Sequence, residues 1–174
     1  MQANFLLPEL VAGEHELGHP ALGAPITAQQ LQSQGILLQT LALNTHAFDI
    51  PLAGIKAQHG YIHHDEVELF QDTPNLDDIL AQYKREHSHE EDEVRFILGG
   101  EGVFDMRDDD DRWMRVSVTR GDLIIIPAGV HHRFFLRDGG HIHAIRLFKS
   151  QRGWVPFYRD RNPTLESLSR SAQS

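Results

Sequence analysis

The second half of the chain alternates apolar and polar side chains with a period of two, which is typical of β-strands. The alternation is clearest at residues 112–119, where Met114, Val116 and Val118 fall on one face. Six segments of strand length are separated by turns rich in Gly or Asp: Val94 to Leu98, Gly102 to Arg107, Arg112 to Thr119, Leu123 to Ile126, His132 to Leu136 and His141 to Phe148. Short strands joined mostly by tight turns predict an antiparallel β-barrel or sandwich of the jelly-roll kind, so the fold class is all-β with a few short helices.

A helical pattern precedes these strands. Leu76, Ile79, Leu80 and Tyr83 recur at the spacing of one helix face and form a single apolar stripe. Asn75 stands directly before them and has the features of an N-cap residue. We therefore expect a helix that starts after Asn75 and packs its stripe against the core.

The N-terminal part gives weaker signals. Thr27 and Gln30 have the spacing of a capping box, which predicts a short helix from Ala28 to Gln34. The apolar run from Ile36 to Leu43 has strand length and is expected to pair with the main sheet. Residues 1–60 thus form an N-terminal covering segment with an added strand. Composition assigns the other segments: irregular structure at 1–26, a connection at 44–51, one or two helical turns at 52–58, and a loose tail at 162–174.

Composition and charge limit the classes of partner. The chain has 174 residues, for which a single domain spanning 1–174 is the natural expectation. A net charge of −9 without a basic block argues against nucleic acid or an anionic membrane as a partner. No run approaches the roughly 20 apolar residues of a membrane span, and the N-terminal segment lacks the basic region of a signal peptide. We expect a cytoplasmic monomer.

Histidine and carboxylate side chains carry the candidate chemistry. The chain contains no Cys, so any metal must be held by nitrogen and oxygen donors. His87 and His89 are two residues apart, and on a strand both rings point to one face. Glu93 follows after three residues that can form a turn. Two imidazoles and a carboxylate suit a divalent transition metal.

A second histidine motif lies at residues 121–132. An apolar strand ends at Pro127, and Gly129 permits a reversal that returns His132 toward the first group. If His132 points inward, Phe134 shares its face and His131 points the other way, so His132 is the fourth ligand. Three imidazoles and one carboxylate leave two positions of an octahedral ion open to water.

Other polar clusters have simpler explanations. His63 and His64 are adjacent and point to opposite faces of a strand, so a second metal site there is not favoured. His141 and His143 share a face of the last long strand, but no carboxylate follows at a suitable offset, and we assign them to the surface. The four Asp residues at 108–111 lack the spacing of a calcium loop and are interpreted as a solvated hairpin tip.

The two motifs together, H-x-H-x3-E-x6-G and G-x5-P-x-G-x2-H, resemble the paired metal-binding motifs of the cupin superfamily. Ala81 departs from the leading Gly of the first motif, and Leu136 from the Asn that often ends the second. The flanking residues are similar to the acireductone dioxygenase family of methionine salvage over roughly residues 60–160. The segments that carry this resemblance are Glu86-His-Ser-His, Asp92-Glu-Val-Arg-Phe, Gly102-Val-Phe-Asp-Met-Arg, Pro127-Ala-Gly-Val-His-His-Arg-Phe, Ala144-Ile-Arg-Leu-Phe and Gly153-Trp154.

The resemblance implies a cupin-type barrel that binds one Fe²⁺ or Ni²⁺ per chain through His87, His89, Glu93 and His132. It implies cleavage of the acireductone 1,2-dihydroxy-3-keto-5-methylthiopentene by O2. With iron the family forms formate and 4-methylthio-2-oxobutanoate, and with nickel it forms 3-methylthiopropanoate, formate and carbon monoxide. Phe134, Trp154 and Tyr83 would supply apolar walls for the methylthio tail, although Tyr83 also fits a plain core position.

Two arginines are candidates for binding the substrate anion beside the metal. Arg95 lies two residues beyond Glu93 and shares its face if the strand has begun, and Arg146 shares a face with Ala144. An arginine inside a barrel is costly unless it is paired, so a structural ion pair is the alternative explanation for each. The resemblance favours the substrate and catalytic role.

Two functions of other kinds stay open on the sequence alone. One is a different cupin enzyme, such as an isomerase or another dioxygenase. The other is a non-catalytic binding module that uses the metal as a staple, for which no accompanying DNA-binding segment is visible. The choice between iron and nickel is equally open, because both ions would use the same four ligands.

Overall fold

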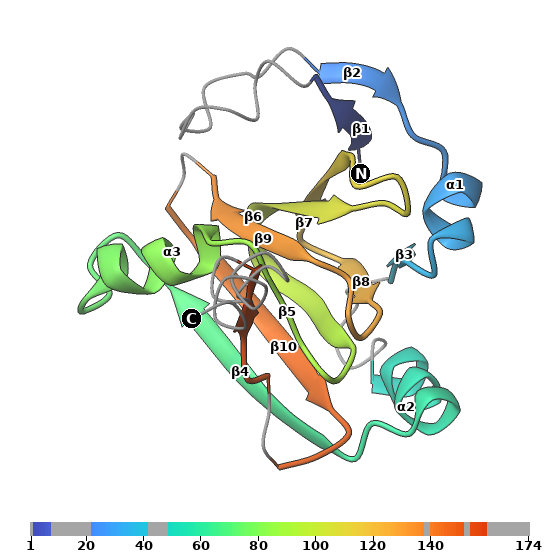
Figure 1. Cartoon of the computed structure of the whole chain (residues 1–174). Helices are drawn as coiled ribbons and strands as arrows, with labels where there is room; N and C mark the ends of the chain where they lie inside the picture. Colours follow the sequence, from blue (N-terminus) through green and yellow to red (C-terminus); the bar gives the residue numbers. More distant parts are fainter. Residues whose placement is uncertain (1, 8–21, 42–48, 138–139, 152–153, 160–174) are drawn as a thin grey trace, which may run out of the picture.

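The computed structural model describes residues 2–7, 22–41, 49–137, 140–151 and 154–159 (Figure 1). The expected tail at 162–174, most of the connection at 44–51 and Gly153 lie outside these residues. The described strands are β1 (Gln2–Leu6), β2 (Leu22–Pro25), β3 (Leu37–Thr40), β4 (His63–Leu69), β5 (His87–Ser88), β6 (Glu93–Arg107), β7 (Trp113–Thr119), β8 (Asp122–Ile126), β9 (His132–Leu136), β10 (Ile142–Phe148) and β11 (Phe157–Tyr158). The described helices are α1 (Ala28–Ser33), α2 (Asp49–His59) and α3 (Leu76–Lys84).

Strand β6 belongs to both sheets of the fold. Its first half pairs with β8 and β10, and its second half pairs with β7 and β9, always antiparallel. The two strands expected at 94–98 and 102–107 are therefore halves of one bent strand. The bend falls at Gly100, whose φ is +72° and where an added Cβ would overlap the carbonyl oxygen of His141. A glycine is needed at this position because the backbone of β6 and the backbone at His141 approach closely there.

The core lies between the two sheets. Phe104, Met106 and Val116 come from one sheet, whereas Ile97 and Ile124 come from the other, and all are buried in one cluster. A second cluster fills the space between α2 and the outer side of the β6–β8–β10 sheet, which α2 covers (Figure 1). The antiparallel β-barrel predicted from the strand pattern is confirmed.

The structure corrects the expectations for residues 1–26 and 52–58, and it confirms that the run at 36–43 pairs with the main sheet. Residues 2–6 and 22–25 are not irregular: they form β1 and β2, and β1 pairs with β7. The run expected to be a strand at 36–43 is strand at 37–40, where it pairs with β8. Helix α2 spans 49–59 rather than one or two turns at 52–58.

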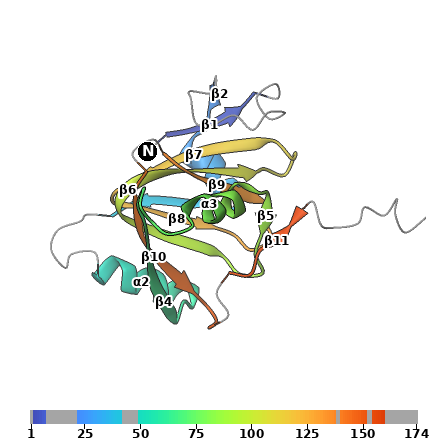
Figure 2. The ribbon, with the colours of Figure 1, turned by 90° about the vertical axis from the view of Figure 1, so that its left-hand side faces the viewer.

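Helix α3 packs its apolar stripe on the core beside β9, as the periodicity predicts (Figure 2). Its start at Leu76 agrees with the prediction. Asn75 is the N-cap residue, as predicted, but it has a left-handed backbone, with φ 57° and ψ 31°, and its side chain makes no cap hydrogen bond. Thr27 does form the capping box with Gln30 that was predicted for α1.

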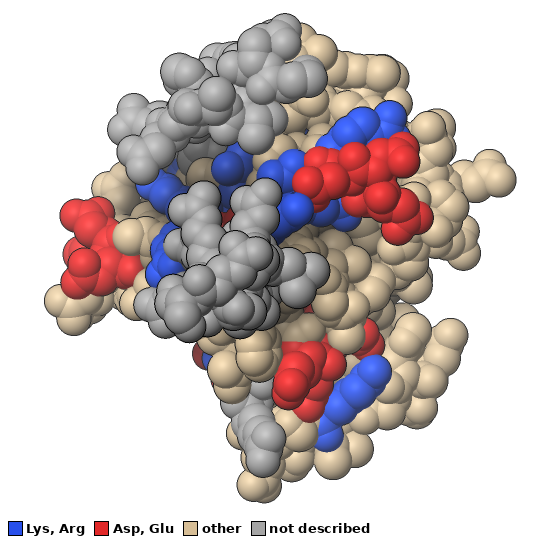
Figure 3. Space-filling view, viewed as in Figure 1, with Lys and Arg blue, Asp and Glu red and all other residues tan. Residues whose placement is uncertain are grey.

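On the face shown in Figure 3, acidic and basic side chains lie against one another. The hairpin tip between β6 and β7 is an example, because Asp108 and Asp110 both pair with Arg112. None of the helices in the described ranges is long and apolar enough to cross a membrane.

Candidate metal centre

Three short segments bring the predicted ligands together. His87 lies on β5 directly opposite His132 on β9, and Glu93 begins β6. His89 lies in the turn between β5 and β6. Its carbonyl oxygen accepts a hydrogen bond from the backbone N–H of Gly129 at 2.9 Å, which joins this turn to the second histidine motif. Gly129 has φ +82°, which makes the predicted reversal. The local turns therefore place two distant histidine motifs at one end of the barrel.

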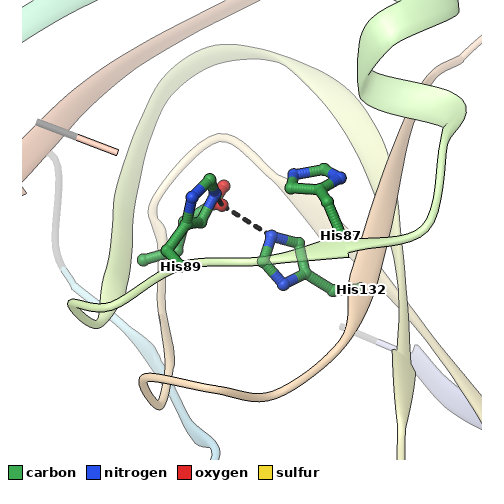
Figure 4. Close-up of side chains that lie close together, drawn as sticks. His87, His89 and His132 are labelled. Carbon is green, nitrogen blue, oxygen red and sulfur yellow. Dashed lines mark hydrogen bonds and ion pairs between the residues drawn. The ribbon is translucent and has the colours of Figure 1, made fainter. Parts of the chain in front are cut away.

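The four side chains offer donor atoms that all lie within 4.8 Å of one another. Glu93 Oε2 is 2.8 Å from His132 Nε2 and 3.2 Å from His89 Nε2. The three imidazoles gather around one point (Figure 4). All four residues are buried, with exposed fractions between 2% and 7%. A buried set of three imidazoles and one carboxylate has the chemistry and the proximity that a divalent ion needs.

The outer nitrogen of each imidazole has a backbone partner. Nδ1 of His87 donates to the carbonyl of Arg85 at 2.6 Å, that of His132 to Val130 at 2.9 Å, and that of His89 to Val155 at 3.0 Å. A ring protonated at Nδ1 presents the lone pair of Nε2 to the centre, which is the tautomer that a metal ligand requires. The donor set thus fits a metal cofactor.

Electrostatics prepare the ligands for a cation. The pKa of His87 is lowered to about 4, first by burial and then by the neighbouring His132, so its ring is neutral at pH 7. Burial by itself raises the pKa of Glu93, but the positive charge of Arg95 opposes burial, and the pKa stays well below the usual range. The centre therefore presents a neutral imidazole and an ionised carboxylate.

A pocket opens on this centre and contains every residue predicted to contact substrate: Tyr83, Arg95, Phe134, Arg146 and Trp154. Tyr83 meets Phe134 edge to face, with ring centroids 6.1 Å apart. Trp154 stacks on His89 and donates its Nε1 hydrogen to the carbonyl of Asp92 at 3.0 Å. Three further lining residues were not found from the sequence: Gln82, Pro156 and Tyr158. Tyr158 reaches the pocket through β11, a two-residue strand that no sequence pattern marks.

Both candidate arginines have a carboxylate partner. Arg95 Nε donates to Glu93 Oε1 at 2.7 Å, and both residues are almost fully buried. Arg146 binds Asp65 through two hydrogen bonds, of 2.7 and 2.6 Å. The structural ion pair that is the alternative explanation for each arginine therefore exists. A role in substrate binding would use the N–H groups that these pairs leave over.

The remaining polar clusters lie away from the centre. His141 pairs with Glu68 and His143 with Glu66 on the outer face of β10 and β4. His64 contacts Lys56 at 3.4 Å. Within the part of the chain that the structure describes, no second group of three such side chains comes close enough to hold an ion.

The comparisons with known proteins identify the family. A model of the ARD/ARD′ family matches residues 13–156. An acireductone dioxygenase from Ixodes scapularis is 39% identical over 163 residues, which cover 89% of this chain and 87% of that protein. The chain belongs to the acireductone dioxygenase (ARD/ARD′) family.

Further relatives of the family agree. An acireductone dioxygenase from Heterostelium pallidum is 42% identical over 135 residues, covering 78% of this chain and 91% of the relative. Among solved structures, an acireductone dioxygenase from Bacillus anthracis with a cadmium ion in its active centre matches with a TM-score of 0.75 and 31% identity, covering 90% of this chain and 97% of that chain. The resemblance to acireductone dioxygenases and the cupin fold that it implies are confirmed.

Proposed function

We propose that this chain is a metal-dependent dioxygenase that cleaves the acireductone 1,2-dihydroxy-3-keto-5-methylthiopentene with O2 in methionine salvage. The observation that carries the proposal is the buried group of His87, His89, Glu93 and His132 at the base of a pocket with aromatic walls and two arginines. Membership of the acireductone dioxygenase family supports the same activity.

The proposed ligands are these four residues, and one Fe²⁺ or Ni²⁺ per chain is the proposed cofactor. When bound, the ion would act as a Lewis acid toward the oxygens of the enediol. The protein's contribution is a dry, shaped site, because all four ligands are buried and Trp154 and Tyr158 line the pocket beside them.

Other side chains would bind and orient the substrate. The guanidinium groups of Arg95 and Arg146 line the same pocket and would hold the anionic enediol by charge-assisted hydrogen bonds. Tyr83, Phe134 and Trp154 would cover the methylthio tail, which is apolar and gains from being removed from water. We further propose that the protein works in the cytoplasm as a monomer, without a nucleic-acid or membrane partner.

The test is product analysis on protein loaded with one metal at a time. The iron form should consume O2 with acireductone and release formate and 4-methylthio-2-oxobutanoate. The nickel form should release 3-methylthiopropanoate, formate and carbon monoxide. Conversion of acireductone without oxygen uptake would favour a cupin isomerase, and the absence of any conversion would favour a metal-stapled binding module.

A further inference from the structure

The face of β4 that packs on the core carries one acid, Asp65. Val67 and Leu69 pack against the core, and Asp65 shares their face because it precedes Val67 by two residues. Asp65 lies directly opposite Arg146 in the pairing of β4 with β10. The neighbouring acids Glu66 and Glu68 pair instead with His143 and His141.

Two kinds of contact hold the guanidinium group of Arg146. The two carboxylate oxygens accept from Nε and Nη2 at 2.7 and 2.6 Å, and this bidentate arrangement defines the plane of the guanidinium group. The guanidinium carbon also lies 5.3 Å from the ring centroids of Trp154 and Phe148. The Asp65 contact uses two of the five N–H groups, and within the described residues no other hydrogen-bond partner of Arg146 occurs.

We propose that Asp65 is a positioning residue, which holds Arg146 so that its remaining N–H groups meet an anionic oxygen of the substrate. The inference rests on the proposed function, because it takes Arg146 to bind the acireductone anion. Asp65 itself need not touch the substrate. A long arginine that is held in place before binding loses less conformational freedom when the anion arrives.

If Asp65 only balanced the charge of Arg146, its removal should have the opposite effect on substrate binding. Asp65 cancels the charge of Arg146, so removing a simple counter-charge would strengthen the attraction for an anion and lower KM. If Asp65 positions Arg146, its removal misplaces a substrate contact and lowers kcat/KM by about tenfold to a hundredfold. The side chain of Asp65 is 46% exposed, so its loss should change the melting temperature little.

A double-mutant cycle tests the proposal on metal-loaded enzyme. The variants are Asp65→Asn, Arg146→Met and the two combined, with Glu66→Gln as a matched control that neutralises the next acid on the same strand. We expect Asp65→Asn to lower kcat/KM about tenfold or more, and the double variant to be no worse than Arg146→Met alone, because Asp65 would act only through Arg146. The control should keep the activity and metal content of the wild type. Losses that multiply in the double variant, or a lower KM in Asp65→Asn, would overturn the positioning role.

A second measurement separates this proposal from the proposed function. If the iron-loaded wild-type protein takes up no O2 with acireductone, the proposed function is refuted. The positioning of Arg146 is then decided by ¹⁵N NMR of zinc-loaded, arginine-labelled protein. Separate Nη signals of Arg146 in the wild type that merge in Asp65→Asn support a held guanidinium group, and signals that are identical in both proteins contradict it.

Discussion

Arg95→Met should destabilise the metal-free protein far more than the metal-loaded protein. Arg95 and Glu93 are 4% and 3% exposed and are joined by a 2.7 Å hydrogen bond, so the variant leaves an ionised carboxylate buried without its partner. Breaking a buried pair in this way costs about 3–5 kcal/mol of the free energy of unfolding. At about 2–4 °C per kcal/mol for a chain of this size, the melting temperature of the metal-free variant should fall by roughly 6–20 °C.

A divalent ion changes this result because it compensates Glu93 in place of Arg95. We expect the metal-loaded variant to lose less than half as much stability as the metal-free variant. The variant should then bind the metal more tightly than the wild type does, by about tenfold for each 1.4 kcal/mol by which the two losses differ. Calorimetric melting with and without metal measures both losses. Arg146→Met is the matched control, since its partner Asp65 is 46% exposed and water can take over its charge. Equal losses for Arg95→Met with and without metal would refute the reasoning.

Three further predictions concern the ligands and the pocket. His132→Ala should abolish activity and sharply lower metal content, whereas His131→Ala should do neither; metal analysis that shows the reverse would mean that the wrong histidine is assigned. Glu93→Gln keeps an oxygen donor without the charge, so metal titration should show weaker binding while circular dichroism shows an intact fold. A collapsed β signal in the metal-free variant would instead mean that the metal is needed for folding. Gly102→Ala would place a Cβ 2.5 Å from the ring of Phe134, so urea unfolding should show a loss of about 1–3 kcal/mol, and an unchanged midpoint would contradict this packing.

The centre of the site was predictable because its signals are local. His87 and His89 sit two residues apart, and a strand period of two is enough to put them on one face and to separate His132 from His131. The inward face of β9 follows from the same rule, since Phe134 and Leu136 both pack in the core. Strong alternation and short turns make the strands of this part of the barrel predictable from the sequence.

The missed features depend on partners far away in the sequence. Strand β4 contains only two apolar residues, Val67 and Leu69, and becomes a strand by pairing with β10. Asp65 is 81 residues from Arg146, so no local pattern announces their contact. Strand formation depends largely on such neighbours. The same holds for β1, which the composition predicts to be irregular and which forms a strand by pairing with β7.

Two glycines misled the prediction in a different way. The strand predicted at Val94 to Leu98 stops before Gly99 and Gly100, because paired glycines often mark a turn. In the structure, β6 continues through both and bends at Gly100, where the chain of β10 passes close by. A glycine signal shows that the backbone needs freedom at a position, but not whether the chain reverses there or only bends.

The most direct test of the account is oxygen uptake by iron-loaded protein in the presence of acireductone. One O2 should be consumed for each acireductone cleaved, at a rate far above that of the same protein after its metal is removed. Uptake no faster than with metal-free protein would contradict it.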